Sequence, residues 1–391
     1  MQFQLSEEQR LIQETARRIA KERVAPRAAE MDVTEEYPHD IYEAFREVGL
    51  LGLTIPEAYG GSGAGVLPLA LAVAEIATYC CASGLVLLLS ALPTQPILIG
   101  GSEEQKQTWL PKSARGEAKG AFCLTEPNSG SDASALETRA VRDGDDYILN
   151  GEKMFISGGT GADFVVAFAK TGSAGSNSGA RGISGFIVPT DSPGFSVAGT
   201  DRKMGVRGVP TANIVFQDVR VGPEQLLGGE EGRGFNHAML TLNSLRPVVG
   251  ARGVGLAEGA MTYALEFARE RQAFGKPIAD LQAIQFMFAD MAIQIEAARL
   301  LVYQGAWLVD QGKYQRENAA LLSIAKAFAT EMAVKVSSDA LQVLGAQGYM
   351  MDHPLERHYR DARQLMIVEG TSQIQRVVIA RALLERELVY P

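Results

Sequence analysis

The chain changes character at Phe122-Cys123-Leu124-Thr125-Glu126-Pro127-Asn128-Ser129-Gly130-Ser131-Asp132. A short apolar run enters a turn rich in Ser, Asn, Gly and Asp, which are residues that turns favour for conformational reasons alone. By itself the stretch predicts a strand followed by a turn, whose backbone amides and hydroxyls could approach a planar ring or a phosphate. The surrounding sequence divides at this point, with helical patterns before it and strand patterns after it.

The residues before this stretch predict helices. Ser6 and Gln9 have the spacing of a capping box, and apolar residues follow at steps of three and four. Further helical patterns cover about 40–50, 66–81 and 103–115. We therefore expect residues 1–120 to form an N-terminal helical domain.

The residues after it predict a sheet. Short runs rich in β-formers occur at 147–149, 164–166, 185–188 and 214–216, and turn-forming residues separate them. A Gly/Ser-rich loop at 172–182 is expected to join two of these strands. Residues 121–232 are thus predicted to be a middle antiparallel β domain.

The helical period returns near Phe235 and persists. In the stretch 281–295, apolar residues alternate steps of three and four, which is typical of a bundle helix. Ser372 and Gln375 again have a capping-box spacing, so a last helix should begin near Ser372. Residues 233–391 are predicted to be a C-terminal four-helix bundle, and the fold class is α+β.

Composition narrows the classes of partner. The 391 residues carry a net charge of -9, which disfavours nucleic acid and anionic membranes as partners. The longest apolar run, 84–92, is shorter than the ~20 residues of a membrane helix. Three cysteines, two of them adjacent, suit a reducing compartment. No targeting signal is visible at the start, so we expect a cytoplasmic protein that binds no membrane.

Five motifs together resemble the acyl-CoA dehydrogenase family over nearly the whole chain. They are Leu124-Thr125-Glu126-Pro127 with Gly130-Ser131-Asp132, Asn150-Gly151-Glu152-Lys153, Lys203-Met204-Gly205, Arg271 to Lys276, and Glu369 to Arg376. The resemblance implies FAD-dependent α,β-dehydrogenation of an acyl-CoA thioester to the 2,3-enoyl-CoA. It also implies a homotetramer that passes its electrons to an electron-transferring flavoprotein.

The resemblance assigns a set of FAD contacts. Phe122, Leu124 and Thr125 should line the flavin edge, and Phe155 and Ser157 should cover the other side of the ring. Arginine is suited to a pyrophosphate because its planar fork matches phosphate geometry. Residues expected to reach the FAD of a neighbouring subunit are Arg271, Phe274, Gln282, Gln342, Gly345 and Ala346. The adenine half should lie against Thr371 and Gln373.

The base that removes the α-proton is expected to be Glu369. It precedes a predicted helix and follows an apolar run, 365–368, while Gly370 allows the backbone to approach a ligand. Desolvation should raise the pKa of this carboxyl and the helix N-terminus should lower it, and the sequence does not say which effect is larger. Some relatives place the base immediately before the arginine that matches Arg246. Leu245 occupies that position here and cannot act as a base.

Five residues are expected to contact the CoA ester. They are Ser131, Asn243, Arg246, Gly370 and Arg381, with Arg246 near the nucleotide end. The segment expected to form the floor of the acyl pocket, Gly84 to Leu89, carries no charge. An uncharged aliphatic, branched or cyclic acyl group is therefore predicted. The stretches 204–210 and 354–363 look most like a bacterial branch that includes cyclic-acyl dehydrogenases.

Three other functions stay open as alternatives. An acyl-CoA oxidase would use dioxygen but normally has a C-terminal extension. A desulfinase of the same branch lacks the glutamate that this chain has, and a DNA-associated flavoprotein would need a basic groove. No metal is assigned, because His353 and His358 have no third ligand beside them. Cys123 has no evident base partner and is interpreted as a packing residue.

Overall fold

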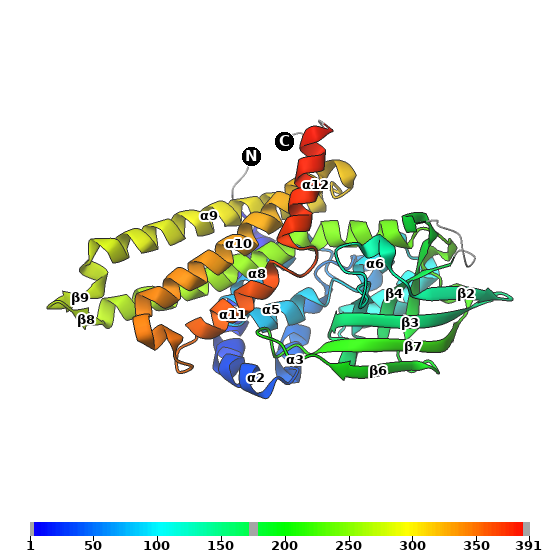
Figure 1. The fold of residues 1–391 in the computed structure, drawn as a ribbon, viewed down its shortest axis with the longest axis horizontal. Coiled ribbons are helices and arrows are strands. Elements are labelled where there is room, and N and C mark those ends of the chain that lie inside the picture. Colours follow the sequence, from blue (N-terminus) through cyan, green and yellow to red (C-terminus); the bar gives the residue numbers. More distant parts are fainter. Residues whose placement is uncertain (1–3, 172–178, 386–391) are drawn as a thin grey trace.

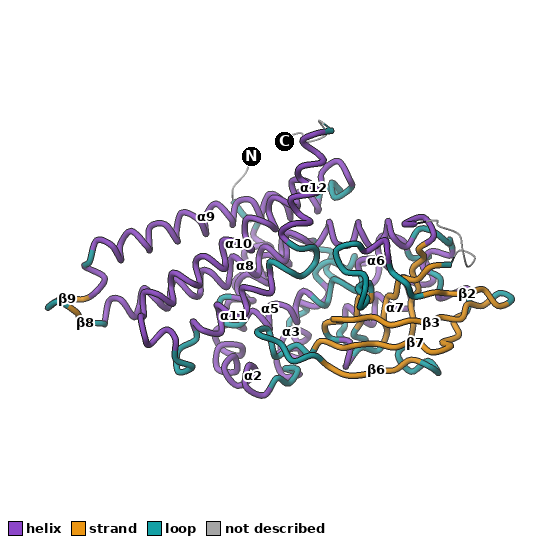
Figure 2. The backbone as a smooth tube through the Cα atoms, viewed as in Figure 1, coloured by secondary structure: helices purple, strands orange, loops and turns teal. Residues whose placement is uncertain are grey.

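A computed structural model describes residues 4–171 and 179–385. The strands gather at one end of the described chain and the helices fill the rest (Figures 1 and 2). Most of the predicted loop at 172–182 lies outside the described residues. The order along the chain is helices, then sheet, then helices, as the sequence predicts.

The N-terminal part is helical. Ser6 caps the first helix with its side chain, and the predicted capping box with Gln9 is present. The pattern at 66–81 is divided, because the chain leaves the helical path at Cys80 and a second helix begins at Cys81. The helices are α1 (Glu7–Ile19), α2 (Ala28–Thr34), α3 (His39–Glu47), α4 (Val66–Ala77), α5 (Cys81–Leu88), α6 (Gln95–Gly100) and α7 (Glu103–Ala114).

The middle part is a seven-stranded sheet with the order β1-β4-β2-β3-β7-β6, in which β5 also pairs with β4. Most pairs are antiparallel, as expected. The β1–β4 pair and a single β2–β4 bridge are parallel, a mixture that local sequence patterns do not reveal. The strands are β1 (Gly120–Cys123), β2 (Arg139–Asp143), β3 (Asp146–Ser157), β4 (Phe164–Lys170), β5 (Ile183–Pro189), β6 (Phe195–Thr200) and β7 (Thr211–Val221).

The C-terminal part consists of long helices that pack side by side. A two-stranded hairpin, β8 (Gln272–Ala273) with β9 (Lys276–Pro277), separates the first two of them. Among the described helices, none combines the length and the apolar composition that a bilayer crossing requires. The helices are α8 (Gly234–Glu270), α9 (Gln282–Asp310), α10 (Ala319–Leu344), α11 (Leu355–Leu365) and α12 (Ser372–Leu384).

The buried core explains how the parts are joined. Apolar residues of α1, α4 and α5 pack with those of α8, α9 and α10 in one continuous cluster, whereas the sheet has a cluster of its own. A third cluster lies where α7 and the start of α8 meet β4 and β5. The segments that surround Glu369 and the turn after β1 are therefore carried by well-packed elements.

Candidate active site

Glu369 lies in the short connection between α11 and α12, where the backbone enters the left-handed region. Its φ is 52°, and the φ of Gly370 is 93°. A residue with a side chain rarely adopts a positive φ, so the surrounding structure must hold it there. A Cβ at position 370 would be strained and would lie 2.6 Å from Gln375 Nε2. The turn therefore depends on a glycine directly after the glutamate.

Two side chains hold this turn by its carbonyl groups. Lys326, buried on α10, donates from Nζ to the Gly370 carbonyl oxygen at 2.8 Å. Gln375 Nε2 donates to the same oxygen at 2.9 Å and to the Glu369 carbonyl oxygen at 3.4 Å. Sequence reasoning did not identify Lys326, and it assigned Gln375 to the helix cap and not to the turn. The one available signal for Lys326 was a charged residue within an otherwise apolar helical stretch.

The cap of α12 differs from the prediction. Thr371, not Ser372, is the capping residue, because its side chain accepts a hydrogen bond from the Ile374 N–H at 3.2 Å. Ser372 is already helical, so the expected capping box of Ser372 with Gln375 is wrong. Gln375 is instead free to reach back to the turn.

The Glu369 carboxyl is enclosed and unpaired. Its Oε2 is buried and has no hydrogen-bond partner among the described residues. Burial raises the pKa of Glu369 to about 7, although nearby positive charges of Arg252, Lys326 and Arg246 oppose the shift. Desolvation of the carboxyl thus outweighs the effect of these three cations. A carboxyl with a pKa near neutrality can accept a proton from a weakly acidic carbon.

The Glu369 backbone is also available to a ligand. The N–H of Glu369 makes no hydrogen bond with any other described residue, because α11 has ended and the turn is bonded through its carbonyls. A free N–H beside a carboxyl is the donor that a thioester oxygen would need. Glu369 therefore offers a buried carboxyl and an unpaired backbone N–H from the same residue.

Arg246 is placed beside this carboxyl. It is buried on α8, and its Nη1 donates to Ser323 Oγ at 3.0 Å. Burial lowers the pKa of Arg246 to about 10, and the negative charge of Glu369 acts in the opposite direction. Arg246 thus acts electrostatically on Glu369, and its expected contact near the nucleotide end of the CoA ester stays a prediction. Leu245, the neighbouring residue, is fully buried.

The residues expected along the flavin come together at β1 and β3. The ring of Phe122 packs against that of Phe168, with the two ring centroids 5.1 Å apart. The Met154 N–H donates to the Thr125 carbonyl oxygen at 2.8 Å, which ties the turn after β1 to β3. Phe155 has a φ of 62° and is 57% exposed, so its ring is displayed and not packed. Leu124 and Ser157 lie on the same two segments.

A buried ion pair between Lys153 and Glu126 lies beneath the segment that carries Leu124 and Thr125. Lys153, on β3, donates from Nζ to Glu126 Oε1 at 2.7 Å, to the Phe168 carbonyl oxygen at 2.6 Å and to the Leu124 carbonyl oxygen at 3.3 Å. Glu126 also accepts from the N–H groups of Glu137 and Thr138. Lys153 belongs to a motif quoted above, but its anchoring role was not foreseen. The pair fixes the segment that carries Leu124 and Thr125.

The residues expected to serve a neighbouring subunit do not join this surface. Figure 1 shows β8 and β9 at the opposite end of the molecule from the sheet. There Phe274 has a φ of 53° and is 91% exposed. The other members of this group are exposed as well, and they are Arg271, Gln282, Gln342, Gly345 and Ala346.

The remaining expected contacts lie on α8, on the turn and helix after Glu369, and in the turn after β1. Asn243 is buried one helical turn before Arg246, and its Nδ2 donates to the Tyr314 carbonyl oxygen at 3.1 Å. Gly370 belongs to the turn itself. Thr371 and Gln373 lie at the start of α12, and Arg381 is exposed further along it. Ser131 is exposed in the turn after β1.

Three residues could suggest other chemistry, but two are hydrogen-bonded and the third is a buried thiol. His353 Nδ1 is hydrogen-bonded to the Tyr263 hydroxyl at 2.8 Å, and His358 is buried against the Leu256 carbonyl. Burial raises the pKa of the Cys123 thiol to about 12, which leaves it protonated. None of the three is placed to bind a metal or attack a substrate.

Three family models match the chain in succession. They are the acyl-CoA dehydrogenase N-terminal domain at residues 6–117, the middle domain at 121–219 and the C-terminal domain at 232–384. The chain therefore belongs to the acyl-CoA dehydrogenase family, and the resemblance drawn from its motifs is confirmed. Members of this family are FAD-dependent oxidoreductases.

Individual relatives match over nearly their full lengths. The acryloyl-CoA reductase (NADH) of Anaerotignum propionicum is 44% identical over 99% of this chain and 97% of its own. The cyclohexane-1-carbonyl-CoA dehydrogenase of Geobacter metallireducens is 42% identical, over 98% and 99%. A chain in the structure of the electron transferring flavoprotein of Acidaminococcus fermentans is 43% identical, with a TM-score of 0.94 and coverage of 98% and 100%.

The described residues fit the cofactor of this family. The exposed Phe155 ring and the hydroxyls of Thr125 and Ser157 border a surface that a planar ring could cover. The exposed Arg271 offers a guanidinium for phosphate oxygens, but it lies at the opposite end of the molecule from the sheet. The site is thus compatible with FAD held between two copies.

Proposed function

We propose that this chain performs the α,β-dehydrogenation of an acyl-CoA thioester with Glu369 as the base. The glutamate takes a proton from the α-carbon, and a double bond forms between the α- and β-carbons as the β-hydrogen leaves with its electron pair. FAD, when bound, supplies the acceptor for that hydride. The product is the 2,3-enoyl-CoA.

The observation that carries this proposal is the state of the Glu369 carboxyl. It is buried without a partner, its pKa is raised to about 7, and its backbone is fixed by Lys326 and Gln375. An unpaired buried carboxyl costs stability, and such a cost is typical of functional sites. Its own free N–H would bind the thioester oxygen and stabilise the enolate that proton removal creates.

The cofactor contacts, the domain division and the oligomer are part of the same proposal. The flavin contacts proposed are Phe122, Leu124, Thr125, Phe155 and Ser157, because β1 and β3 bring them together. We keep the domain division 1–120, 121–232 and 233–391 as a proposal. A homotetramer, and cross-subunit contacts from the group around Arg271, are proposed because that group is far from its own sheet.

An electron-transferring flavoprotein is the proposed redox partner. A 43% identical chain occurs in a structure described as such a flavoprotein, which supports this partner over dioxygen. The acyl group is proposed to be uncharged, because the floor segment on α5 is apolar and buried. A cyclic or branched group fits the 42% identical cyclohexane-1-carbonyl-CoA dehydrogenase.

A second candidate is the same chemistry run backwards. One relative, 44% identical, is named as an acryloyl-CoA reductase. Protonation of the α-carbon by Glu369 would then follow hydride delivery to the β-carbon. A carboxyl with a pKa of about 7 can serve as acid or base at neutral pH, so the site residues are common to both directions.

An anaerobic screen tests the proposal. The purified holoenzyme is mixed with straight, branched, cyclic and aromatic acyl-CoAs, and flavin bleaching and enoyl-CoA formation are followed. At least one uncharged acyl-CoA should bleach the flavin within seconds, and the reduced enzyme should be reoxidised faster by an electron-transferring flavoprotein than by air. Bleaching by none of them, with rapid reduction of enoyl-CoAs instead, would favour the reductase.

A further inference from the structure

Arg252, on α8, is a fully buried cation whose hydrogen-bond partners are all neutral. Its Nη2 donates to the Cys81 carbonyl oxygen at 3.3 Å, to Cys81 Sγ at 3.4 Å and to Gln364 Oε1 at 3.2 Å. Burial raises the pKa of the Cys81 thiol to about 12, so this sulfur carries no charge. Among the described residues, no carboxylate is hydrogen-bonded to the guanidinium.

Two other nitrogens of Arg252 have no partner at all. Nε and Nη1 are buried, and neither makes a hydrogen bond within residues 4–171 and 179–385. A buried charge without a paired opposite charge destabilises a fold, and unmet buried donors add to that loss. Groups of this kind occur preferentially at functional sites. Arg252 lies in none of the five motifs quoted above.

One side of Arg252 faces the start of α5. Cys81 is the first residue of that helix and precedes the predicted acyl floor, Gly84 to Leu89. A Cβ on Gly84 would lie 3.6 Å from Arg252 Cγ, so the stem of the arginine runs alongside the first residue of the floor. The arginine therefore holds the end of α5 from which the floor begins.

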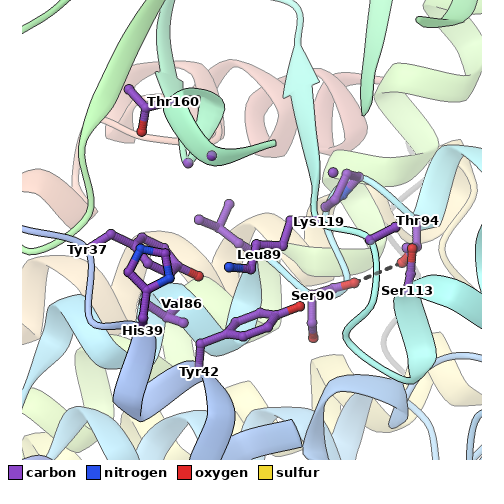
Figure 3. A pocket seen from close by; sticks show the side chains of 15 residues that line it. Tyr37, His39, Tyr42, Val86, Leu89, Ser90, Thr94, Ser113, Lys119 and Thr160 are labelled. Atoms are coloured by element: carbon purple, nitrogen blue, oxygen red, sulfur yellow. Dashed lines mark hydrogen bonds between the residues drawn. The ribbon is translucent and has the colours of Figure 1, made fainter. Parts of the chain in front are cut away.

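The other end of α5 borders open space. Val86, near the end of the helix, and Leu89, directly after it, line a cavity of about 160 Å³ together with Tyr37 and Tyr42 (Figure 3). A helix surface that faces a cavity lacks packing partners there. The contacts of Arg252 at the start of α5 therefore contribute more to fixing the floor than they would in a closely packed helix.

The other side of Arg252 faces the end of α11. The carbonyl oxygen of Gln364 accepts hydrogen bonds from the Ile367 N–H at 2.8 Å and the Val368 N–H at 3.1 Å. Val368 directly precedes Glu369. Arg252 thus binds the side chain of the residue whose main chain fixes the approach to the base. Since the same Nη2 contacts α5 and α11, one guanidinium ties the acyl floor to the segment that carries Glu369.

Arg252 also acts on Glu369 through its charge. Burial raises the pKa of Glu369 to about 7, and Arg252 is the foremost of the three cations that oppose this shift, ahead of Lys326 on α10 and Arg246 on α8. The Oε2 atom of Glu369 has no hydrogen-bond partner among the described residues. Charges in a buried region are weakly screened, so Arg252 can favour the carboxylate without contacting it.

Two further ionisable groups share this region. The charge of Arg252 also acts on Lys203, whose pKa burial lowers to about 8. Asp361, on α11, is buried, and burial raises its pKa to about 6, while its Oδ1 accepts the Val206 N–H at 2.6 Å. A titration near neutral pH therefore has to be assigned to Glu369 by a variant of that residue.

We propose that Arg252 is a positioning residue, which fixes the acyl floor and the base relative to each other and favours the carboxylate form of Glu369. It acts through Gln364 and through its charge, and no hydrogen bond or ion pair joins it to the base among the described residues. The proposal rests on the proposed dehydrogenation, because it takes Glu369 as the base.

Three variants of the holoenzyme separate the two effects. Anaerobic flavin bleaching by one uncharged acyl-CoA is followed as a function of pH. Wild-type bleaching should rise through about pH 7, whereas Arg252→Met should rise at higher pH and be roughly tenfold slower at about pH 6. Arg252→Lys keeps the charge and should restore the wild-type position of the rise. Gln364→Leu keeps the arginine, so it should lower the rate roughly threefold at every pH without moving the rise.

The position of the pH rise decides between a positioning role and a purely structural one. Since Arg252 is buried with unmet donors, Arg252→Met should melt at the wild-type temperature or above it. Arg233→Met, the same change at an exposed arginine just before α8, is the control and should alter neither rate nor pH dependence. An unmoved rise in Arg252→Met overturns the proposal, whether or not that variant is less stable.

The charge of Glu369 can also be followed without turnover. In infrared difference spectra of the holoenzyme, the protonated-carboxyl band that is missing in Glu369→Gln reports this residue. The band should disappear through about pH 7 in wild type and at higher pH in Arg252→Met. If no acyl-CoA bleaches the flavin but the band shifts, the proposed reaction fails and the action of Arg252 on the carboxyl stands. Normal wild-type bleaching with an unshifted band would overturn the role of Arg252 alone.

Discussion

Lys326 connects the backbone of the Glu369 turn to the charge of its side chain. Its Nζ donates to the Gly370 carbonyl at 2.8 Å, and its charge opposes the burial that raises the Glu369 pKa. Burial lowers the pKa of Lys326 itself to about 8. Arg246 and Arg252 on α8 are the other cations that act on Glu369, so removal of Lys326 leaves the carboxyl less compensated but not isolated.

Lys326→Met should move the pH dependence of the reaction and lower its rate. The base must be ionised, so wild-type kcat/KM should rise with pH through about 7, the pKa of Glu369. Loss of a nearby cation disfavours the carboxylate, so this rise should occur at higher pH in the variant. Loss of a charged hydrogen bond to the turn should lower kcat about 10- to 100-fold. Lys335→Met, an exposed change on the same helix, is the control and should alter neither quantity.

A purely structural role for Lys326 would give a different result. The variant would then lose stability while its pH profile kept the wild-type midpoint. Thermal unfolding measured beside the pH profile separates the two roles.

At the scale of elements, the sequence predicted features that depend on local patterns better than it predicted contacts between elements. The capping box of Ser6 and the helix at 103–115 are visible in sequence because their hydrogen bonds span three or four residues. The bond from Lys326 to Gly370 spans 44 residues, and no periodicity reports it. The cap of α12 was placed one residue late because Thr371 and Ser372 are both good capping residues, and only the backbone distinguishes them.

The proposed flavin surface is another element-scale feature, and the sequence predicted only part of it. Its motif residues were visible, but the anchoring of Leu124 by Lys153 depends on β1, β3 and β4 meeting side by side. Likewise, the parallel pairing of β1 with β4 cannot be read from alternating patterns. Contacts of this kind arise from the folded topology.

Lys153→Met should destabilise the middle sheet and loosen the flavin surface. It leaves the Glu126 carboxylate buried without its partner, which costs about 3–5 kcal/mol in comparable buried pairs. FAD should dissociate more readily, and the melting temperature of the apoprotein should fall. The double variant Lys153→Met with Glu126→Gln should recover part of that stability.

Glu152→Gln supplies the matched control, because Glu152 is exposed on the same strand. It should change the stability by no more than about 0.5 kcal/mol. If Lys153→Met also melted like wild type, the ion pair would not be the anchor described here.

At the scale of the whole molecule, two groups of proposed FAD contacts lie at opposite ends of the molecule. One group lies at the sheet and the other at the β8–β9 end, as Figure 1 shows. Exposed Phe274 and Arg271 belong to the second group. If both groups bind the same FAD, the site must be built from two copies.

Mixing two inactive variants tests this arrangement. Arg271→Ala keeps the base but lacks the donated arginine, and Glu369→Gln keeps the arginine but lacks the base. When the two are co-expressed or refolded together, some sites receive Glu369 from one chain and Arg271 from the other. Activity should therefore appear in the mixture at a substantial fraction of wild type, whereas each variant alone stays low. A mixture no more active than its components would place both residues in the same site of one chain.

The central claim is that Glu369 removes the α-proton, and anaerobic stopped-flow bleaching of the Glu369→Gln holoenzyme tests it most directly. The variant should keep its FAD and bind the acyl-CoA, yet bleach at least about 10³-fold more slowly, within the range that a general base contributes. Wild-type bleaching should rise with pH through about 7, and the residual rate of the variant should not. Bleaching of the variant within tenfold of wild type, with the same pH dependence, would contradict the assignment of the base.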